Sequence, residues 1–195
     1  MIIQTILALV NVILLIVSVS VNNGLFTINF DNIFNSQIGV YKYKYRGENL
    51  ETRIESVNCS DTGFEQFKDV GKSNLENFSD TTDDIDTSYC ETIQIVSPIL
   101  IVFNVLIFML AGLIKIKALK QTRLISVLIK LLSTITICLN LVLIVIIILY
   151  SNSYDTPFFD IIETYMNYGF YLICVSLVIS LISFIAYLRH PVKKG

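Results

Sequence analysis

The sequence predicts an all-α membrane protein, a four-helix transmembrane bundle with a small disulfide-linked β/α extracellular domain in its first loop. Three observations support this prediction. Hydrophobic residues make up 54% of the 195 residues, which is more than an ordinary soluble domain contains. Four apolar runs are each long enough to cross roughly 30 Å of hydrocarbon as a helix. The polar segment between the first two runs, residues 22–92, contains two of the four cysteines.

The four spans are expected at residues 1–21, 93–114, 127–150 and 165–188. Each should be α-helical, because a backbone in lipid must satisfy its own hydrogen bonds. The first run ends in Ser18-Val19-Ser20, a small-x-small triplet of the kind that signal peptidases cleave. Cleavage is therefore an alternative, but the run exceeds the roughly 7 to 15 apolar residues of a signal peptide. We expect it to be a retained anchor.

Charged residues predict the orientation of the spans. The connection at residues 115–126 and the tail at 189–195 contain lysine and arginine but no acid, whereas all 16 acidic residues lie in the loops at 22–92 and 151–164. We expect both termini in the cytoplasm and both acidic loops outside, in the plasma membrane or another secretory-pathway membrane. The lipid bilayer is the predicted partner. The net charge of −2 averages these two faces and indicates no nucleic-acid partner.

The first loop is predicted to begin as a small sheet. Tyrosine and lysine alternate over residues 41–45, and this alternation indicates a strand. Residues 50–57 form a second candidate strand, whose acids are expected to face the lysines across a hairpin, and residues 25–30 form a third. Beyond Cys59, apolar residues between Phe64 and Phe78 recur at helical spacing. We expect a short helix there.

Cys59 and Cys90 are the cysteines that lie outside the predicted spans. In an oxidising extracellular loop they are expected to form a disulfide, with two free thiols as the alternative. Such a bridge would tie the middle of the loop to the start of the second span. The chain-entropy model gives it roughly 3 to 4 kcal/mol of stabilisation.

Two modification sites and one failed metal motif lie in the same loop. Asn58 and Asn77 begin N-x-Ser sequons and are predicted glycan acceptors on the outer side. Aspartates 80–86 suggest calcium, but aligning Asp84 to the first ligand of an EF-hand places Tyr89 where the motif needs glycine. We therefore expect no metal site.

Each span carries polar or small residues in steps of three and four. Steps of this kind face a neighbouring helix in left-handed packing, where Asn and Ser can bond across the interface. Lys130 is the one charged residue within a span, close enough to the cytoplasmic end for its amine to reach water. We expect this polar seam to face inward, and its candidate residues are Asn11, Asn104, Lys130, Asn140, Ser176 and Ser180.

The expected architecture resembles that of the claudin and peripheral-myelin-protein tetraspan superfamily, including its fungal eisosome relatives. The shared features are four spans with inside termini, a large first outer loop with a sheet and a disulfide, and a short second loop. The resemblance covers the whole chain as architecture. Claudin-type loops carry Trp, then Gly-Leu-Trp, then two closely spaced cysteines. Here Gly39-Val40-Tyr41 replaces the triplet, there is no tryptophan, and Cys59 and Cys90 are widely spaced. Tight-junction strand formation is therefore not implied.

The residue types favour a non-enzymatic function. There is one histidine, His190, no Cys-x-x-Cys motif and no pairing of a nucleophile with a base. We expect no cofactor. The predicted function is that of a multi-pass membrane organiser or adhesion protein, which acts through its outer loop and through lateral contacts with itself or other membrane proteins. The alternative is a channel subunit or accessory, in which Asn11, Asn104 and Asn140 line a path between copies.

Overall fold

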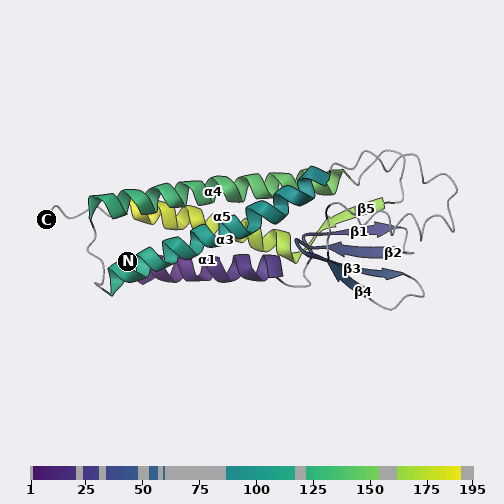
Figure 1. The fold of residues 1–195 in the computed structure, drawn as a ribbon, viewed down its shortest axis with the longest axis horizontal. Coiled ribbons are helices and arrows are strands. Elements are labelled where there is room, and N and C mark those ends of the chain that lie inside the picture. The colour runs from purple at the N-terminus through teal and green to yellow at the C-terminus, as the bar shows by residue number, and fades with distance from the viewer. Residues whose placement is uncertain are drawn as a thin grey trace.

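The computed structural model describes residues 2–20, 24–30, 34–47, 53–56, 59, 87–116, 122–153 and 162–189. Four helices lie side by side, and a five-stranded sheet lies beyond one end of the bundle (Figure 1). The following lie outside the described residues: both sequon asparagines (Asn58 and Asn77), the predicted helix at residues 64–78, the aspartate cluster at 80–86, and His190.

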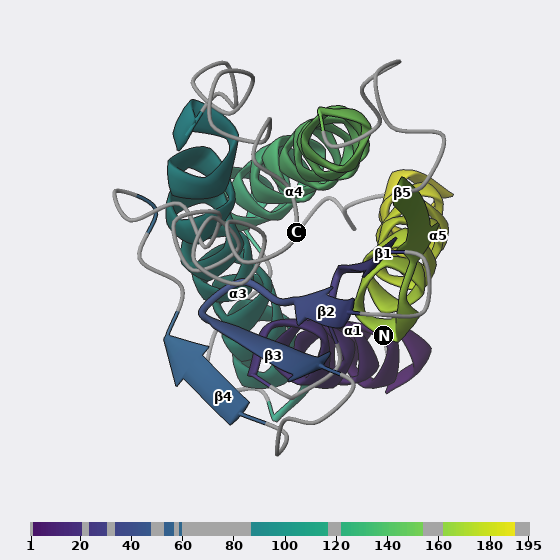
Figure 2. The ribbon, with the colours of Figure 1, turned by 90° about the vertical axis from the view of Figure 1, so that its right-hand side faces the viewer.

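The helices form a ring in which each contacts two neighbours. They are α1 (Ile2–Ser20), α3 (Thr87–Lys115), α4 (Arg123–Asn152) and α5 (Tyr168–Arg189). Both α1 and α4 pack against α3 and α5, and Figure 2 shows this ring along its axis. The start of α1 and the end of α5 lie at the end of the bundle away from the sheet (Figure 1).

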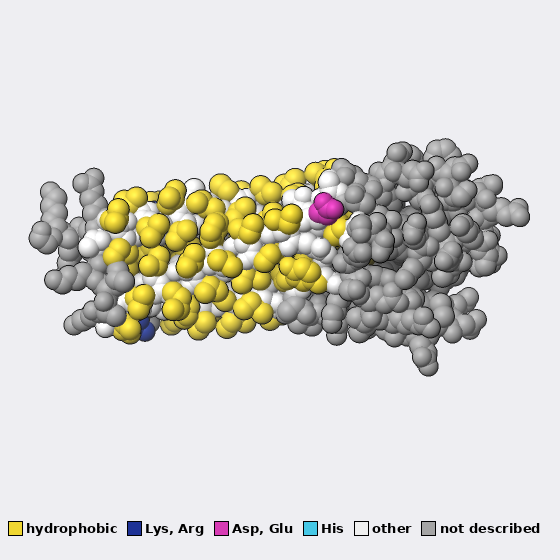
Figure 3. All heavy atoms as spheres, viewed as in Figure 1, with side chains coloured by type: hydrophobic (Ala, Val, Ile, Leu, Met, Phe, Trp, Pro, Cys, Tyr) yellow, Lys and Arg dark blue, Asp and Glu magenta, His cyan; other side chains and the backbone are white. Residues whose placement is uncertain are grey.

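The outer surface of the bundle is apolar. Figure 3 shows hydrophobic side chains along its whole visible length, and exposed residues such as Val102, Val145 and Val178 belong to this surface. Three helices, α3, α4 and α5, are long and apolar enough to span a membrane. The first predicted span, residues 1–21, corresponds to α1, an apolar helix of 19 residues that is shorter than these three. The structure therefore supports a membrane protein with three candidate spans.

All five strands are antiparallel to their neighbours, in the order β4-β3-β2-β1-β5. Four come from the first loop, namely β1 (Phe26–Phe30), β2 (Phe34–Ile38), β3 (Lys42–Gly47) and β4 (Arg53–Ser56). The fifth, β5 (Ile162–Met166), directly precedes α5 and pairs with β1. Two connections that are far apart in the sequence therefore build one sheet, and residues 165 and 166, which were expected in the fourth span, belong to that sheet.

The predicted pairing of lysines with acids across the hairpin is wrong. The register places Tyr43 opposite Glu55 and Lys44 opposite Ile54. In this register Glu55 is therefore not paired with a lysine. A shift of one residue in register exchanges the two faces, and the spacing of charges alone did not determine that register.

The sheet and the bundle share one hydrophobic core. Phe26 of β1 is 0% exposed, and its ring meets Tyr150 of α4 edge to face with 5.3 Å between centroids. Such aromatic pairs stabilise by about 0.5–1.5 kcal/mol beyond the area that they bury. Gly24 permits the approach of β1 to β2, because a Cβ there would lie 3.0 Å from the carbonyl oxygen of Ile38.

Candidate functional site

The polar seam lies inside the ring of helices. Five of its six candidate residues are buried: Asn11, Asn104, Asn140, Ser176 and Ser180. The sixth, Lys130, is half-buried, and its carbonyl oxygen accepts a hydrogen bond from Thr134 within the same helix. Because the buried members come from all four helices, the interior of the bundle is polar at several levels.

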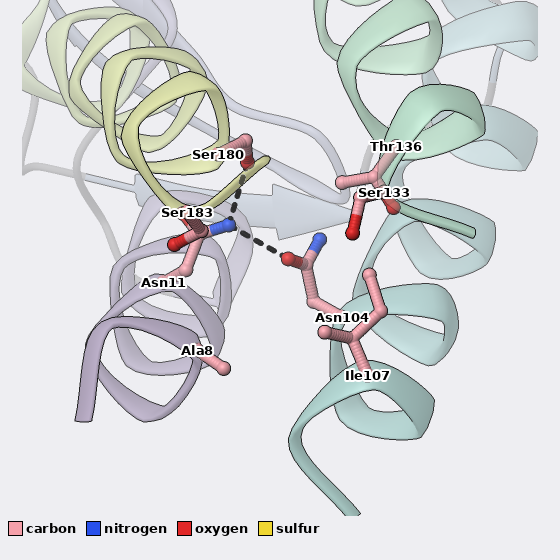
Figure 4. Close-up of a pocket in the computed structure, with 8 residues that line it drawn as sticks. All are labelled: Ala8, Asn11, Asn104, Ile107, Ser133, Thr136, Ser180 and Ser183. Atoms are coloured by element: carbon pink, nitrogen blue, oxygen red, sulfur yellow. Dashed lines mark hydrogen bonds between the residues drawn. The ribbon is translucent and has the colours of Figure 1, made fainter. Parts of the chain in front are cut away.

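Asn11 forms the central junction of this seam. Its Nδ2 donates to Oδ1 of Asn104 at 2.7 Å and to Oγ of Ser180 at 2.8 Å. Figure 4 shows the two bonds, with Asn11 and Asn104 directed toward each other from α1 and α3. One amide group therefore joins three helices through side chains that are nearly inaccessible to solvent.

Two further donors at this level are used within their own helices. Nδ2 of Asn104 donates to the carbonyl oxygen of Leu100 at 2.9 Å, and Oγ of Ser133 donates to that of Ile129 at 2.8 Å. Bonds of this i to i−4 kind are common for polar side chains inside helices.

A cavity of about 20 Å³ lies at the centre of the junction. All four helices line it, and none of its lining residues is ionisable; they are Ala8, Asn11, Asn104, Ile107, Ser133, Thr136, Ser180 and Ser183. Three polar atoms of this lining are buried without a hydrogen-bond partner among the described residues, namely Oδ1 of Asn11, Oγ1 of Thr136 and Oγ of Ser183.

Unpartnered polar atoms also occur on either side of the cavity. Toward the sheet they are Oδ1 of Asn140 and Oγ of Ser176, and toward the other end they are Nε2 of Gln4 and the Tyr187 hydroxyl. Leaving a buried polar group without a bond costs about 1–3 kcal/mol. The polar side chains of the interior therefore cost stability, which apolar side chains at these positions would not.

A disulfide joins Cys59 to Cys90, with 5.6 Å between their Cα atoms. This confirms the predicted bridge. Both residues are buried, and they belong to the core shared by the sheet and the bundle. Since Cys90 lies in the first turn of α3, the bridge fixes the chain beyond β4 to that helix.

Two further contacts attach the sheet to the helices. Gln94 of α3 donates from Nε2 to the carbonyl oxygen of Val40 at 3.1 Å and accepts a bond from the Tyr41 hydroxyl at its own carbonyl oxygen. Asn167, between β5 and α5, donates from Nδ2 to the Thr27 hydroxyl and from its backbone amide to the carbonyl oxygen of Leu25. Partial burial raises the pKa of the Tyr41 phenol above its ordinary value.

No group of three or more His, Cys, Asp or Glu side chains that could hold a metal ion occurs among the described residues. The free thiol Cys138 is exposed and Cys174 is half-buried. Both lie on helices that are apolar enough to span a membrane.

Sequence reasoning did not select Thr136, which lines the cavity. The signal that could have found it is its spacing of three from Ser133 and four from Asn140, which places all three on one helix face. The Gln94 contacts carried no such signal, because they depend on how the loop folds back onto α3.

No family model matches the chain, and no curated protein matches it.

Proposed function

We propose that the chain is a non-enzymatic multi-pass membrane protein of claudin-like build, which organises membranes or mediates adhesion through its sheet and through lateral contacts. The sheet faces the outside of the plasma membrane or of another secretory-pathway membrane, and both termini face the cytoplasm. Support for this orientation comes from basic residues at the far end of the bundle, where α3 ends in Lys115 and α5 ends in Arg189. Such residues favour the cytoplasmic side.

The observation that carries the proposal is the single sheet built from both outer connections. Its strands come from residues 26–56 and 162–166, and it is fastened to the helices by the disulfide, by Gln94 and by Asn167. A sheet held this firmly presents a fixed surface, and fixing a binding surface in advance reduces the entropy lost on binding. This favours recognition of a partner over the lining of a catalytic site.

We further propose that α1 also spans the membrane, as the first of four spans, and is a retained anchor. Its 19 residues extend about 28 Å at 1.5 Å per residue, close to the hydrocarbon thickness. It packs against α3 and α5, and Asn11 bonds to both. Removal of this helix would leave Asn104 and Ser180 buried without that partner, which supports retention over cleavage.

The test is surface crosslinking on intact cells that express the full chain, with a lysine reagent that does not cross membranes. We expect crosslinked products above the monomer mass, because lysines of the sheet loop face outward in this proposal. Cys90→Ser should reduce them, since it releases the loop from α3. Cys174→Ser is the matched control, because it removes a half-buried thiol of α5, and its products should equal those of the original chain. Products that are absent, or equal in both variants, would overturn the proposal.

The rival function is a channel subunit or accessory. Asn11, Asn104 and Asn140 are buried within the bundle, which favours the organiser function over a path between copies. Purified protein in liposomes decides between the two functions. Ion or solute flux that Asn140→Leu abolishes would establish the channel function, whereas the organiser function predicts no flux above that of empty liposomes.

The predicted glycans belong to the same proposal. If Asn77 and Asn58 lie on the outer side, a glycosidase should lower the apparent mass of the protein from native membranes, and Asn77→Gln should remove most of that shift. An unchanged mass in both experiments would contradict an outward-facing loop.

A further inference from the structure

Gly112 of α3 leaves a hollow beside that helix. A Cβ atom at this position would have no neighbour within 4 Å, either from another helix or from the side chains one turn away. Glycine in a membrane helix commonly lets a second backbone come close. No described segment of the chain comes close to Gly112, so the packing of this chain does not explain the glycine.

The hollow has an apolar rim and a cation beside it. Met109 and Ile116, which are 53% and 69% exposed, lie three residues before and four residues after Gly112, on the same side of the helix. Lys115, in the last turn of α3, is exposed and lies three residues after Gly112. Since α3 is long and apolar enough to span a membrane and ends away from the sheet (Figure 1), the hollow lies near one end of a candidate span.

We propose that this hollow is a docking site for an anionic phospholipid. The ammonium group of Lys115 donates to the lipid phosphate, and the glycerol and upper acyl chain contact Met109, Gly112 and Ile116. Basic residues close to a membrane surface attract anionic lipids. Under the proposed orientation this lipid belongs to the cytoplasmic leaflet, but its binding to the purified protein does not depend on that orientation.

Charge selects a lipid over a second copy of the chain as the occupant. A two-fold contact uses the same patch on both copies, so it would bring Lys115 close to its own counterpart. The acidic residues among the described part of the chain, Glu55, Glu91 and Glu163, belong to the sheet or to the start of α3. They lie at the opposite end of the bundle, so an anionic lipid supplies the negative charge that a second copy lacks here.

Binding of phosphatidylserine and phosphatidylcholine to the purified full chain in mixed micelles, followed by native mass spectrometry, tests the proposal. We expect a preference for phosphatidylserine, and Gly112→Leu should remove most of it because leucine fills the hollow. The melting temperature of Gly112→Leu should not fall, since its Cβ meets no atom and leucine favours a helix more than glycine does.

Val105→Leu is the matched control for Gly112→Leu. Val105 is 37% exposed and lies two turns before Gly112 on the same side of α3, so the added bulk lies away from the hollow. Its binding of phosphatidylserine should equal that of the original chain. Equal binding in the two leucine variants, or equal binding of the two lipids to the original chain, would overturn the proposal.

A second pair of variants separates a site from a general attraction to positive charge. Lys115→Gln should weaken phosphatidylserine binding about fivefold, the factor that corresponds to one basic residue near an anionic membrane surface. Arg189→Gln removes the same charge from the end of α5, which lies across the ring from α3 (Figure 2), and should change the binding little. Equal losses in both variants would assign the preference to net charge and contradict a site at Gly112.

Two further outcomes would identify a different occupant. Soluble glycerol phosphate in large excess should not displace phosphatidylserine, because it lacks the acyl chains that fill the hollow. Displacement would show that a free phosphate is sufficient and would overturn lipid docking. A dimer mass that appears without added lipid and is lost in Gly112→Leu would identify a second copy as the occupant.

Discussion

The Tyr41 hydroxyl donates a hydrogen bond to the backbone carbonyl oxygen of Gln94 across 3.3 Å. That carbonyl lies four residues before Pro98, inside α3, and proline has no N–H with which to complete the helical bond. The sheet connection therefore supplies a donor where the helix lacks one. Gln94 reciprocates by donating to the Val40 carbonyl oxygen, so the two segments are held by a pair of opposed bonds.

Tyr41→Phe should lower the free energy of unfolding by about 0.5 kcal/mol, at the low end of the usual range for a hydrogen bond, because Tyr41 is 40% exposed. Denaturant titration of the purified protein, followed by circular dichroism, measures this change. Tyr171→Phe is the control, since Tyr171 is an exposed tyrosine of α5 and should cause no measurable change.

A double-mutant cycle identifies the mechanism of that loss. Pro98→Ala restores the amide that bonds to the Gln94 carbonyl oxygen, which then has a helical partner. Tyr41→Phe should consequently cost less in the Pro98→Ala background than in the original chain. Equal costs in the two backgrounds would show that the tyrosine does not act through this carbonyl.

Titration of the Tyr41 hydroxyl should make the stability of the protein depend on pH. Burial raises the pKa of Tyr41 in the folded protein above its ordinary value of 10.0, so the folded state holds this proton more tightly than the unfolded state. The contribution is fully present below about pH 10 and is lost as pH rises through the raised pKa. Melting temperatures between pH 8 and 11 should therefore fall less steeply in Tyr41→Phe than in the original chain. Parallel curves would contradict the prediction.

The sequence predicted the helices well and the sheet only in part. Long apolar runs define helices in lipid without reference to the rest of the chain, and α3, α4 and α5 follow from them. The strand β2 has no such signature, because Asn35, Ser36 and Gln37 interrupt any alternation of apolar residues. It forms through pairing with β1 and β3 on both sides, which is a tertiary effect.

The location of β5 has a different cause. Residues 165 and 166 adjoin an apolar run and were therefore expected in the fourth span, and residues 162–164 were expected in the second outer loop. The edge pairing of residues 162–166 with β1 depends on two loops that meet at one end of the bundle. For the candidate site, periodicity predicted an inward seam, but it could not predict the bonds that Asn11 makes. Those bonds depend on the relative heights of α1, α3 and α5, which no single span encodes.

Ser180→Ala and Ser176→Ala should have opposite effects on stability. Ser180 accepts a bond from Asn11, so its removal should cost about 0.6 kcal/mol, the average for side-chain bonds between helices in membranes. Ser176, one turn away and also buried, has no partner for its hydroxyl among the described residues. Its removal should leave stability unchanged or increase it. Unfolding of both variants in mixed micelles measures the difference, and a larger loss for Ser176→Ala would contradict the assigned bonds.

Cys90→Ser should produce the largest single loss. The bridge closes a loop with a sequence separation of 31, for which the chain-entropy model gives roughly 3 to 4 kcal/mol. Cys138→Ser is the matched control, because that thiol is free and exposed on an apolar helix, and it should change the melting temperature little. Reduction of the original chain should reproduce the Cys90→Ser result, since both open the same loop. A reduced protein as stable as the oxidised one would mean that the hydrophobic contacts around Phe26 and Tyr150 hold the sheet on the helices without the bridge.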